Sequence, residues 1–367
     1  MSDGFTPPLA ARSTRVRRTV VPFDDRTGLL RMDRNEDVSG WDEHRLGDVL
    51  QRLTPVDFAA YHDADHIQAR IARWLGLEAF NISVTAGSSE AVQLVFETYL
   101  DEGEVVVTLD PSYGLYEVFA AKCGGRMVGV PFDEGLEISV EAIVDAIRQH
   151  SPSLVVIANP NQPTGTVLRA ECLRILAREA LTQGAILLFD EAYCLFTPVT
   201  AIPLVEEFPN VVVCQTFSKA MGLAGLRLGY CVSDSSRIDE INRLRPLTQS
   251  NAVALAVAEY VLDNYDWAAE RVAEIIEGRE YLIARLREMG LETYNSHANF
   301  ALIGCPSEQD AETLVCQLRR RGYAVRGPLR GYLLDNFVRV TVARLDIMRR
   351  FVSENEDLLL LHARASQ

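Results

Sequence analysis

The sequence lacks several features that would place a protein in a specialised class. It has no run approaching the roughly 20 apolar residues of a membrane-spanning helix, so we expect a soluble protein. It has no internal repeat, no low-complexity stretch and no Gly/Ser linker, which argues against solenoid and disordered proteins. Residues 1–18 carry arginines with no apolar core after them, so we expect a loose tail and not a secretory signal.

Cysteine pairs and excess positive charge are missing as well. The seven cysteines are an odd number, show no C-x-x-C spacing and mostly lie in apolar runs, which predicts reduced core thiols of a cytoplasmic protein. The formal charge of -15 would repel nucleic acids and anionic membranes, so we expect neither as a partner. We predict no metal site. An anionic ligand would need a local cluster of cations and backbone amides.

The chain is long enough, at 367 residues with 48% hydrophobic content, for one large globular domain and a smaller one. From about residue 80, short apolar runs alternate with longer amphipathic ones, an order that predicts an α/β fold with a mainly parallel sheet covered by helices. Predicted strands span 81–85, 104–109, 125–130, 154–158, 185–189, 211–215 and 229–232. Predicted helices between them span 88–100, 140–149 and 169–182.

The pattern changes after residue 243. A long helical stretch over 252–288 is followed by shorter α and β pieces, which predicts a second, smaller α/β domain. We therefore expect a large domain over 41–245 and a small C-terminal domain over 246–367. The N-terminal segment 1–40 is expected to associate with the small domain.

The most informative segment is Thr216-Phe-Ser-Lys-Ala-Met-Gly-Leu-Ala-Gly-Leu-Arg-Leu-Gly-Tyr230, which begins at the end of a strongly apolar strand. Taken alone, Lys219 could be a surface lysine that follows a strand. Thr216, Ser218 and Arg227 supply hydroxyl and guanidinium donors around it, and such donors suit a phosphate group. The whole constellation therefore favours a ligand site.

Two further motifs stand where strands are predicted to end. Asp190 follows the strand 185–189, and a carboxylate there faces the ligand crevice of an open α/β sheet, although a helix N-cap is the common alternative. Gly87, Ser88 and Ser89 form a turn before a helix, whose free amides can bind an anion. Ordinary helix capping would explain that turn equally well.

These segments resemble the fold-type I, class I/II aminotransferases that use pyridoxal 5′-phosphate (PLP). The form Ser-Lys-Ala-x-x-Leu-Ala-Gly-Leu-Arg is especially similar to histidinol-phosphate aminotransferases. The resemblance implies PLP fold type I, with a large domain built on a mainly parallel seven-stranded sheet. It implies that Lys219 is the Schiff-base lysine, that Asp190 pairs with the pyridinium nitrogen, and that Tyr193 bonds the ring hydroxyl. These three are the expected catalytic residues.

The resemblance also implies the rest of the cofactor site. Thr216, Ser218 and Arg227, together with the turn of Gly87, Ser88 and Ser89, would hold the cofactor phosphate. Tyr113, in Asp110-Pro-Ser-Tyr113, matches the aromatic residue that stacks on the ring. Gln162 stands where the family has an asparagine that bonds the ring oxygen, and Asn161 is the alternative. Tyr61 matches a tyrosine that reaches the neighbouring subunit's PLP phosphate, which implies a homodimer with shared active sites.

Two arginines near the C-terminus, Arg326 and Arg339, lie at or beside short predicted strands. An arginine among apolar strand residues needs a partner, which is either a bound anion or an internal carboxylate. By resemblance, Arg339 grips the substrate carboxylate or phosphate, Arg326 is a second anion contact, and Asn299 lies beside the site. Asn35 belongs to the family's substrate-selecting loop, which departs from the family pattern here at residues 37–38.

The resemblance implies an aminotransferase that moves an amino group between an anionic amino acid, or a phosphorylated or phosphonate amine, and a 2-oxo acid such as 2-oxoglutarate. The altered loop favours a role outside primary histidine synthesis. A PLP decarboxylase or lyase of the same fold, similar to phosphothreonine decarboxylases, is the alternative. A non-catalytic binding relative is a second alternative, against which the intact Lys219, Asp190 and Arg227 argue.

Overall fold

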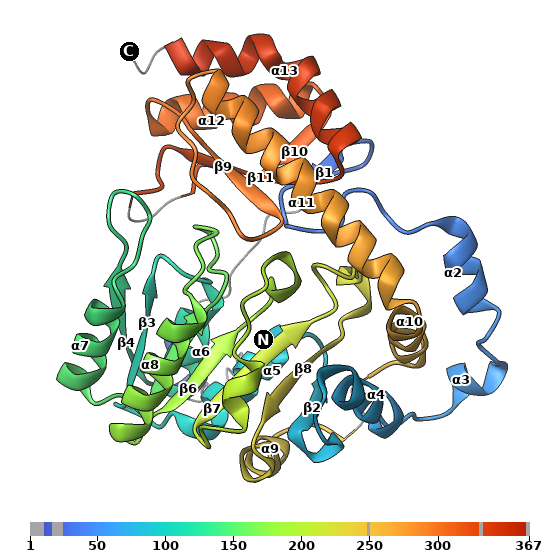
Figure 1. Cartoon of the computed structure of the whole chain (residues 1–367), viewed down its shortest axis with the longest axis vertical. Coiled ribbons are helices and arrows are strands. Elements are labelled where there is room, and N and C mark those ends of the chain that lie inside the picture. Colours follow the sequence, from blue (N-terminus) through green and yellow to red (C-terminus); the bar gives the residue numbers. More distant parts are fainter. Residues whose placement is uncertain (1–10, 17–24, 248–249, 330–332, 365–367) are drawn as a thin grey trace, which may run out of the picture.

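The computed structural model describes residues 11–16, 25–247, 250–329 and 333–364. A seven-stranded sheet with its helices forms the larger part of the chain, and a smaller layer of strands and helices lies above it in Figure 1. Most of the predicted N-terminal tail lies outside the described residues. In the described ranges, no helix is both long and apolar enough to cross a membrane.

The helices are α1 (Ala11–Arg15), α2 (Glu43–Leu50), α3 (Pro55–Ala59), α4 (Asp65–Leu75), α5 (Ser88–Tyr99), α6 (Leu115–Cys123), α7 (Val140–His150), α8 (Ala170–Thr182), α9 (Ser235–Asn242), α10 (Ala252–Asp263), α11 (Tyr265–Glu288), α12 (Glu308–Arg320) and α13 (Leu345–Arg364). The strands are β1 (Leu30–Met32), β2 (Ile82–Thr85), β3 (Val105–Asp110), β4 (Arg126–Pro131), β5 (Leu154–Ala158), β6 (Ile186–Asp190), β7 (Val211–Thr216), β8 (Gly229–Ser233), β9 (Phe300–Gly304), β10 (Tyr323–Val325) and β11 (Phe337–Thr341).

The large sheet confirms the predicted α/β fold. Its strand order is β2-β8-β7-β6-β5-β3-β4, and β8 runs antiparallel to both of its neighbours while the other pairs are parallel. The seven strands coincide with the seven predicted runs to within about one residue at each end. Parallel strands buried on both faces need continuous Val, Ile and Leu runs, and those runs made the strands predictable.

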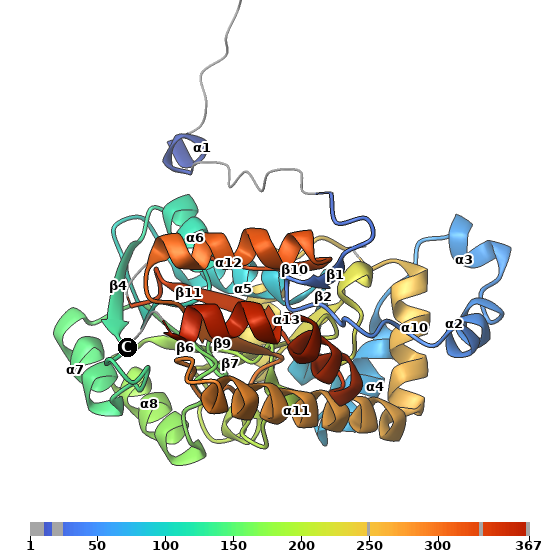
Figure 2. The same cartoon turned by 90° about the horizontal axis from the view of Figure 1, so that it is seen from above.

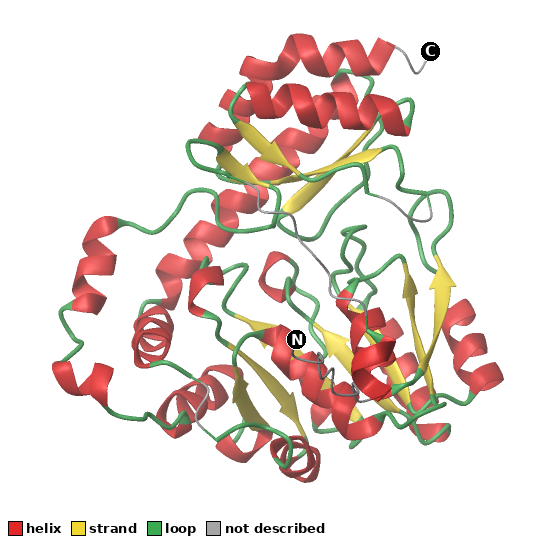
Figure 3. Cartoon of the chain, turned by 180° about the vertical axis from the view of Figure 1, so that it is seen from behind, coloured by secondary structure: helices red, strands yellow, loops and turns green. Residues whose placement is uncertain are grey.

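Helices cover both faces of this sheet, as Figure 3 shows. Along β5, Val155 and Ile157 pack into the core formed with α4, α7, α8 and α10, because alternate side chains of a strand point to opposite faces. Leu154 and Val156 pack into the opposite core, formed with α5 and α6. The carboxyl ends of the parallel strands β3, β5, β6 and β7 meet at one edge, where an open α/β sheet binds ligands.

The helical stretch predicted over 252–288 is interrupted at Asn264. Its side-chain amide donates to the Tyr260 carbonyl at 2.8 Å, and its main-chain N–H donates to Tyr260 O and Val261 O at 3.0 and 3.2 Å. These bonds close α10, and the backbone of Asn264 has φ -119° and ψ 39°, outside the helical region. The single predicted stretch is therefore two helices, α10 and α11.

The small domain has its own core beneath α11, α12 and α13, which lie side by side when seen from above (Figure 2). Strand β1 of the N-terminal segment pairs in parallel with β10, with Leu30 opposite Tyr323 and Met32 opposite Val325. By contrast, α1 lies against α6 of the large domain, where Arg15 and Glu102 form an ion pair.

The packing of α10 and α11 bears on the predicted boundary at residue 245. Buried residues of α10, and Ala268 of α11, belong to the core of the large domain. From Val272 onward, α11 contributes to the core of the small domain. We therefore propose that the boundary lies within α11, between Ala268 and Val272.

Candidate active site

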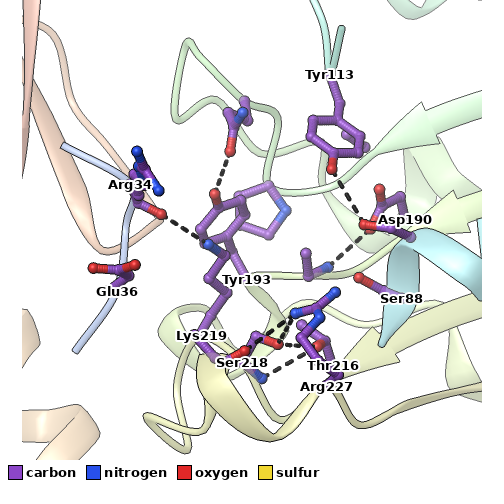
Figure 4. A pocket seen from close by; sticks show the side chains of 16 residues that line it. Arg34, Glu36, Ser88, Tyr113, Asp190, Tyr193, Thr216, Ser218, Lys219 and Arg227 are labelled. Carbon is purple, nitrogen blue, oxygen red and sulfur yellow. Dashed lines mark hydrogen bonds between the residues drawn. The ribbon is translucent and has the colours of Figure 1, made fainter. Parts of the chain in front are cut away.

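A cavity of about 280 Å³ lies at the carboxyl edge of the large sheet, facing the loop that follows β1 (Figure 4). Its lining combines strand ends and turns of the large domain with two residues of that loop. The lining residues are Arg34, Glu36, Ser88, Ser89, Tyr113, Ala158, Pro160, Gln162, Asp190, Ala192, Tyr193, Thr216, Ser218, Lys219, Ala224 and Arg227. Most of the predicted cofactor residues therefore lie around one cavity.

A cluster of hydrogen-bond donors forms one end of the cavity. Arg227 donates from Nη1 to Ser218 Oγ at 3.4 Å and to Ala224 O at 3.2 Å. The Thr216 hydroxyl lies 3.0 Å from the Ser218 hydroxyl. The first residues of α5, Ser88 and Ser89, line the cavity beside them, where helix amides lack partners within the helix. Hydroxyls, a guanidinium group and a helix N-terminus together suit a phosphate group.

Gly87 makes this cluster possible, although it does not itself line the cavity in the described structure. Its φ of 87° lies in the left-handed region that favours glycine. A Cβ atom at this position would lie only 2.7 Å from Nη2 of Arg227. Because glycine has no Cβ, the guanidinium group can lie directly over the turn that begins α5.

A carboxylate, Asp190, lies on another wall of the cavity at the end of β6. It is 5% exposed, and it accepts hydrogen bonds from the Tyr116 hydroxyl at 2.7 Å and from Ala192 N at 3.2 Å. Burial raises the pKa of Asp190, while the bonds from Tyr116 and Ala192 oppose that rise. A carboxylate so placed is suited to pair with a cationic ring nitrogen. The chain continues from Asp190 into a turn and the short 3-10 helix Cys194–Phe196, so Asp190 does not cap a regular helix.

Tyr113 lies beside this wall, as Figure 4 shows. Its hydroxyl is 3.2 Å from the Ser89 hydroxyl, and its ring meets the ring of Tyr116 edge-on, with centroids 5.5 Å apart. These contacts fix the ring against the cavity, where it can face a planar ligand.

Lys219 lies between the donor cluster and the loop after β1. Loss of hydration in the cavity, together with the positive charge of Arg339, lowers its pKa to about 8. The ammonium group donates to the carbonyl of Arg34 at 3.1 Å and to that of Asn35 at 3.2 Å. A lysine with this pKa carries a usable fraction of neutral amine near neutral pH.

Gln162, and not Asn161, faces the cavity. The Gln162 side-chain carbonyl accepts a hydrogen bond from the Tyr193 hydroxyl. The side chain of Asn161 is directed into its own loop, where it bonds Pro111 O and the Thr164 hydroxyl, both at 3.0 Å. Burial raises the pKa of Tyr193 to about 12, so its phenol stays protonated and can donate.

Two predicted substrate residues, Asn35 and Asn299, lie behind the lining. Asn35 is fully buried and donates from Nδ2 to the Tyr193 hydroxyl at 2.8 Å. Asn299 donates to the carbonyl of Asn35 at 3.1 Å, the same carbonyl that Lys219 contacts. Both therefore position the loop and the tyrosine, and direct substrate contact stays a prediction for them.

Arg339 and Arg326 also lie outside the lining of the described cavity. Arg339 is 8% exposed, donates from Nη2 to Asp33 O at 3.0 Å, and has burial as the main cause of a lowered pKa. Within the described residues, its Nε has no hydrogen-bond partner. Arg326 is exposed and exchanges main-chain hydrogen bonds of 3.0 and 2.7 Å with Arg339. The orphaned Nε leaves Arg339 with an unused donor.

Tyr61 is far more exposed than the other predicted residues, at 91%. It lies at a separate surface hollow with Phe58 and His62, and not at the described cavity of its own chain. This position is compatible with a contact across subunits, which stays a prediction.

Arg34, Glu36 and Tyr116 were not among the site residues predicted from the sequence. Arg34 and Glu36 flank Asn35, which was predicted, so the loop that contains them could be identified from the sequence. Tyr116 follows Tyr113 by about one helical turn, but nothing in the sequence shows that its hydroxyl turns back to Asp190. Contacts between separate elements carry no sequence signal.

The residues present fit PLP. The donor cluster suits its phosphate, Asp190 its ring nitrogen, Tyr113 its ring face, and Lys219 its aldehyde. Because Gly87 has no Cβ, the guanidinium group of Arg227 lies against the start of α5, where an anion would bind both the guanidinium group and the helix amides. Fold and site together define an enzyme of PLP fold type I.

Comparison with known proteins gives the family. The family model for aminotransferases of class I and II matches residues 51–349. A histidinol-phosphate aminotransferase from Roseiflexus castenholzii is 32% identical over 344 residues, which cover 92% of this chain and 91% of the relative. The chain belongs to the class I and II aminotransferases, and its cofactor is PLP.

Solved structures agree with this assignment. Histidinol-phosphate aminotransferase from Sinorhizobium meliloti, in complex with PLP, is similar with a TM-score of 0.81 and 26% identity, covering 99% of this chain and 97% of that chain. L-Threonine-O-3-phosphate decarboxylase from Porphyromonas gingivalis is similar with a TM-score of 0.74 and 19% identity, covering 90% and 99%. The second likeness concerns the fold alone.

Proposed function

We propose that this aminotransferase moves an amino group from an anionic amino acid, or a phosphorylated or phosphonate amine, to a 2-oxo acid such as 2-oxoglutarate. The observation that carries the proposal is the position of Lys219. Its amine lies between the donor cluster and the loop after β1, and the guanidinium group of Arg339 bonds that same loop. The named relatives act on histidinol phosphate, which supports a phosphorylated amine as one candidate donor.

The chemistry divides between the cofactor and three residues. PLP, when bound, supplies a ring that accepts the negative charge developing at the donor's Cα. Lys219 would hold the cofactor through Nζ, and the same nitrogen would take the donor's Cα proton, a general-base role worth about 10²–10⁴ in rate. Its pKa of about 8 supports this role, because the neutral amine is accessible near pH 7. Asp190 would hold the proton of the ring nitrogen, and the Tyr193 hydroxyl, which donates to Gln162 in this structure, would donate to the ring oxygen.

The remaining residues bind and orient. We assign Ser88, Ser89, Thr216, Ser218 and Arg227 to the cofactor phosphate. Gln162 lies against the Tyr193 hydroxyl, where its side-chain amide can reach the same ring oxygen, and Tyr113 covers the ring face. The unpartnered Nε of Arg339 supports a role in binding the donor's anionic group.

We also propose a homodimer in which Tyr61 completes the partner's site. The segment from α2 to Tyr61 exposes a run of large apolar or aromatic side chains: Leu46, Leu50, Val56, Phe58 and Tyr61, at 41%, 49%, 65%, 71% and 91%. Such a concentration is typical of a surface that another chain covers. A cytoplasmic location is proposed with it, because the described cysteines are free thiols.

A donor screen tests the reaction. Purified holoenzyme is mixed with amino acids, phosphorylated amines and phosphonate amines, one at a time, without an acceptor. We expect an active donor to convert the cofactor to its aminated form, seen by absorbance, and 2-oxoglutarate to restore the original spectrum. Release of CO₂ without an acceptor would instead identify a decarboxylase, and absence of any spectral change with every donor would support a non-catalytic relative.

Subunit complementation tests the shared site. Lys219→Ala and Tyr61→Ala chains are each expected to be impaired alone. Mixed dimers should regain activity at the one site that combines Lys219 of one chain with Tyr61 of the other. No regain in demonstrably mixed dimers would contradict sharing.

A further inference from the structure

Two charged residues of the cavity, Arg34 and Glu36, are not among the residues that we assign to the cofactor. Both belong to the loop after β1, and in Figure 4 they lie on the side of Lys219 away from Asp190. The carbonyl of Arg34 accepts a hydrogen bond from Lys219 at 3.1 Å, which ties this residue to the reacting amine. A donor whose Cα lies at Lys219 would therefore extend toward these two side chains.

Glu36 is already neutralised by Arg26. The Arg26 guanidinium donates to both Glu36 carboxylate oxygens, at 2.9 and 3.3 Å, and to Asp33 at 2.9 Å. These bonds raise the pKa of Arg26, with the Glu36 bond as the largest cause. Both carboxylates are therefore paired, and the single charge of Arg26 balances one of their two negative charges.

Arg34 is held much more loosely. Its Nε is 3.4 Å from the second carboxylate oxygen of Asp33, a length typical of a weak ion pair, and its side chain is 45% exposed. Within the described ranges, its guanidinium group makes this one long contact. Its terminal nitrogens are thus available for a bidentate bond to a carboxylate or phosphate.

Arg34 and Arg339 approach the same residue from two sides. Arg339 bonds the carbonyl of Asp33, while Arg34 contacts its carboxylate. Counting Arg26, three guanidinium groups surround two carboxylates, Asp33 and Glu36, which leaves one positive charge in excess. Arg326, the second anion contact expected from sequence, is exposed and lies outside the lining of the described cavity.

We propose that Arg34 is a specificity-determining residue that selects donors with a second anionic group at the far end, a distal carboxylate or phosphate. Arg339 binds the first anionic group and Arg34 the second. The same pair accommodates a 2-oxo dicarboxylate in the return half-reaction. This inference rests on the proposed function, because it assigns the substrate class of that same site.

The test compares two classes of ligand on the holoenzyme. Donors with one anionic group, such as L-alanine, are compared with O-phospho-L-serine and L-glutamate in wild type, Arg34→Gln, Arg34→Lys and Arg326→Gln. Arg31→Gln is the matched control, since Arg31 is an exposed arginine three residues earlier that lies outside the lining. Binding of unreactive succinate and acetate is measured in parallel by calorimetry.

Loss of a charge-assisted bidentate bond costs about ten- to hundredfold in affinity. We expect Arg34→Gln to lower kcat/KM for the doubly anionic donors by about this factor, mainly through KM, and to weaken succinate binding equally. L-Alanine and acetate should change less than about threefold. Arg34→Lys should recover part of the loss, because it keeps the charge but not the planar fork.

Three results would overturn the proposal: equal losses for both ligand classes in Arg34→Gln, unchanged succinate binding, or a selective loss in Arg326→Gln in place of Arg34→Gln. Arg34-dependent succinate binding in an enzyme that converts no donor would leave the inference standing and remove the proposed reaction. The two failures are therefore distinguishable.

Discussion

At the cofactor end of the cavity, the polar groups belong to strand ends and turns of one sheet, whereas at the substrate end they lie outside that sheet. The cofactor end consists of Ser88, Ser89, Asp190, Thr216, Ser218 and Arg227, and the substrate end consists of Arg34, Asn35, Glu36 and Arg339. The substrate end is assembled from the loop after β1 and from β11 of the small domain. Ion pairs of Arg26 and Arg271 hold the loop.

This difference indicates which property of the enzyme a substitution at each end should change. We expect a change at the cofactor end to disturb a turn whose geometry one sheet fixes, and so to weaken binding of the cofactor. A change at the substrate end alters charges on a loop held by side-chain pairs, so the choice of ligand can change while the cofactor stays. Each prediction below measures whether a residue acts at one end only.

Removing Lys219 should have the largest effect, because this residue serves both ends. We expect Lys219→Ala to reduce transamination by about 10²–10⁴-fold or more, as the general base and the covalent link are both lost. The chain contains only one other lysine, Lys122, which pairs with Glu97 and provides the control Lys122→Ala. Borohydride reduction of the holoenzyme followed by peptide mass spectrometry should mark Lys219, and a mark on Lys122 would refute the assignment.

Removing Arg227 should affect the cofactor end alone. Arg227→Gln eliminates charge-assisted bonds to the phosphate, so we expect PLP affinity to fall about ten- to hundredfold. Titration of PLP-free protein by absorbance measures this loss. At saturating PLP, KM for the donor should stay within about threefold of wild type. A large change in the donor's KM with unchanged PLP affinity would contradict the assignment of Arg227 to the cofactor end and would place it at the substrate end.

The reactivity of Lys219 should depend on pH, because its burial between the two ends of the cavity lowers its pKa. Its pKa is lowered to about 8, so the neutral amine predominates above pH 8 and its fraction falls about tenfold for each pH unit below. We expect the rate of covalent PLP capture by PLP-free protein to rise with pH and level off near pH 8. Continued rise toward pH 10 would mean that the cavity does not lower this pKa.

Removing the ion pairs of Arg26 with Asp33 and Glu36 should give the smallest effect, and this effect should be confined to the substrate end. Arg26→Gln frees the Asp33 and Glu36 carboxylates, which then compete for Arg34 and repel an anionic donor. We expect KM for doubly anionic donors to rise about tenfold, with PLP affinity unchanged. Steady-state kinetics and PLP titration check the two halves, with Arg31→Gln as control. Loss of PLP affinity would show that the ends are not independent.

The sequence alone determined the large sheet and the cofactor, PLP, and it predicted which residues hold the cofactor. Continuous apolar runs such as 154–158 define buried parallel strands, and the segment from Thr216 to Arg227 contains its own chemistry within one strand and turn. Short-range patterns of this kind depend on neighbouring residues, so they can be read without a fold. The choice between Gln162 and Asn161 could not, because it depends on which side chain the turn directs inward.

Only the tertiary structure decided the substrate end. Asn35 lies hundreds of residues before Asn299 and Arg339 in the sequence, and the contacts of these two residues with the Asp33–Glu36 loop arise in the fold in which β1 pairs with β10. Tyr116 reaches Asp190 in the same way, across two elements. Motifs identify residues that act with their sequence neighbours, whereas Arg339 joins the charges around Arg34 only because folding brings it to Asp33.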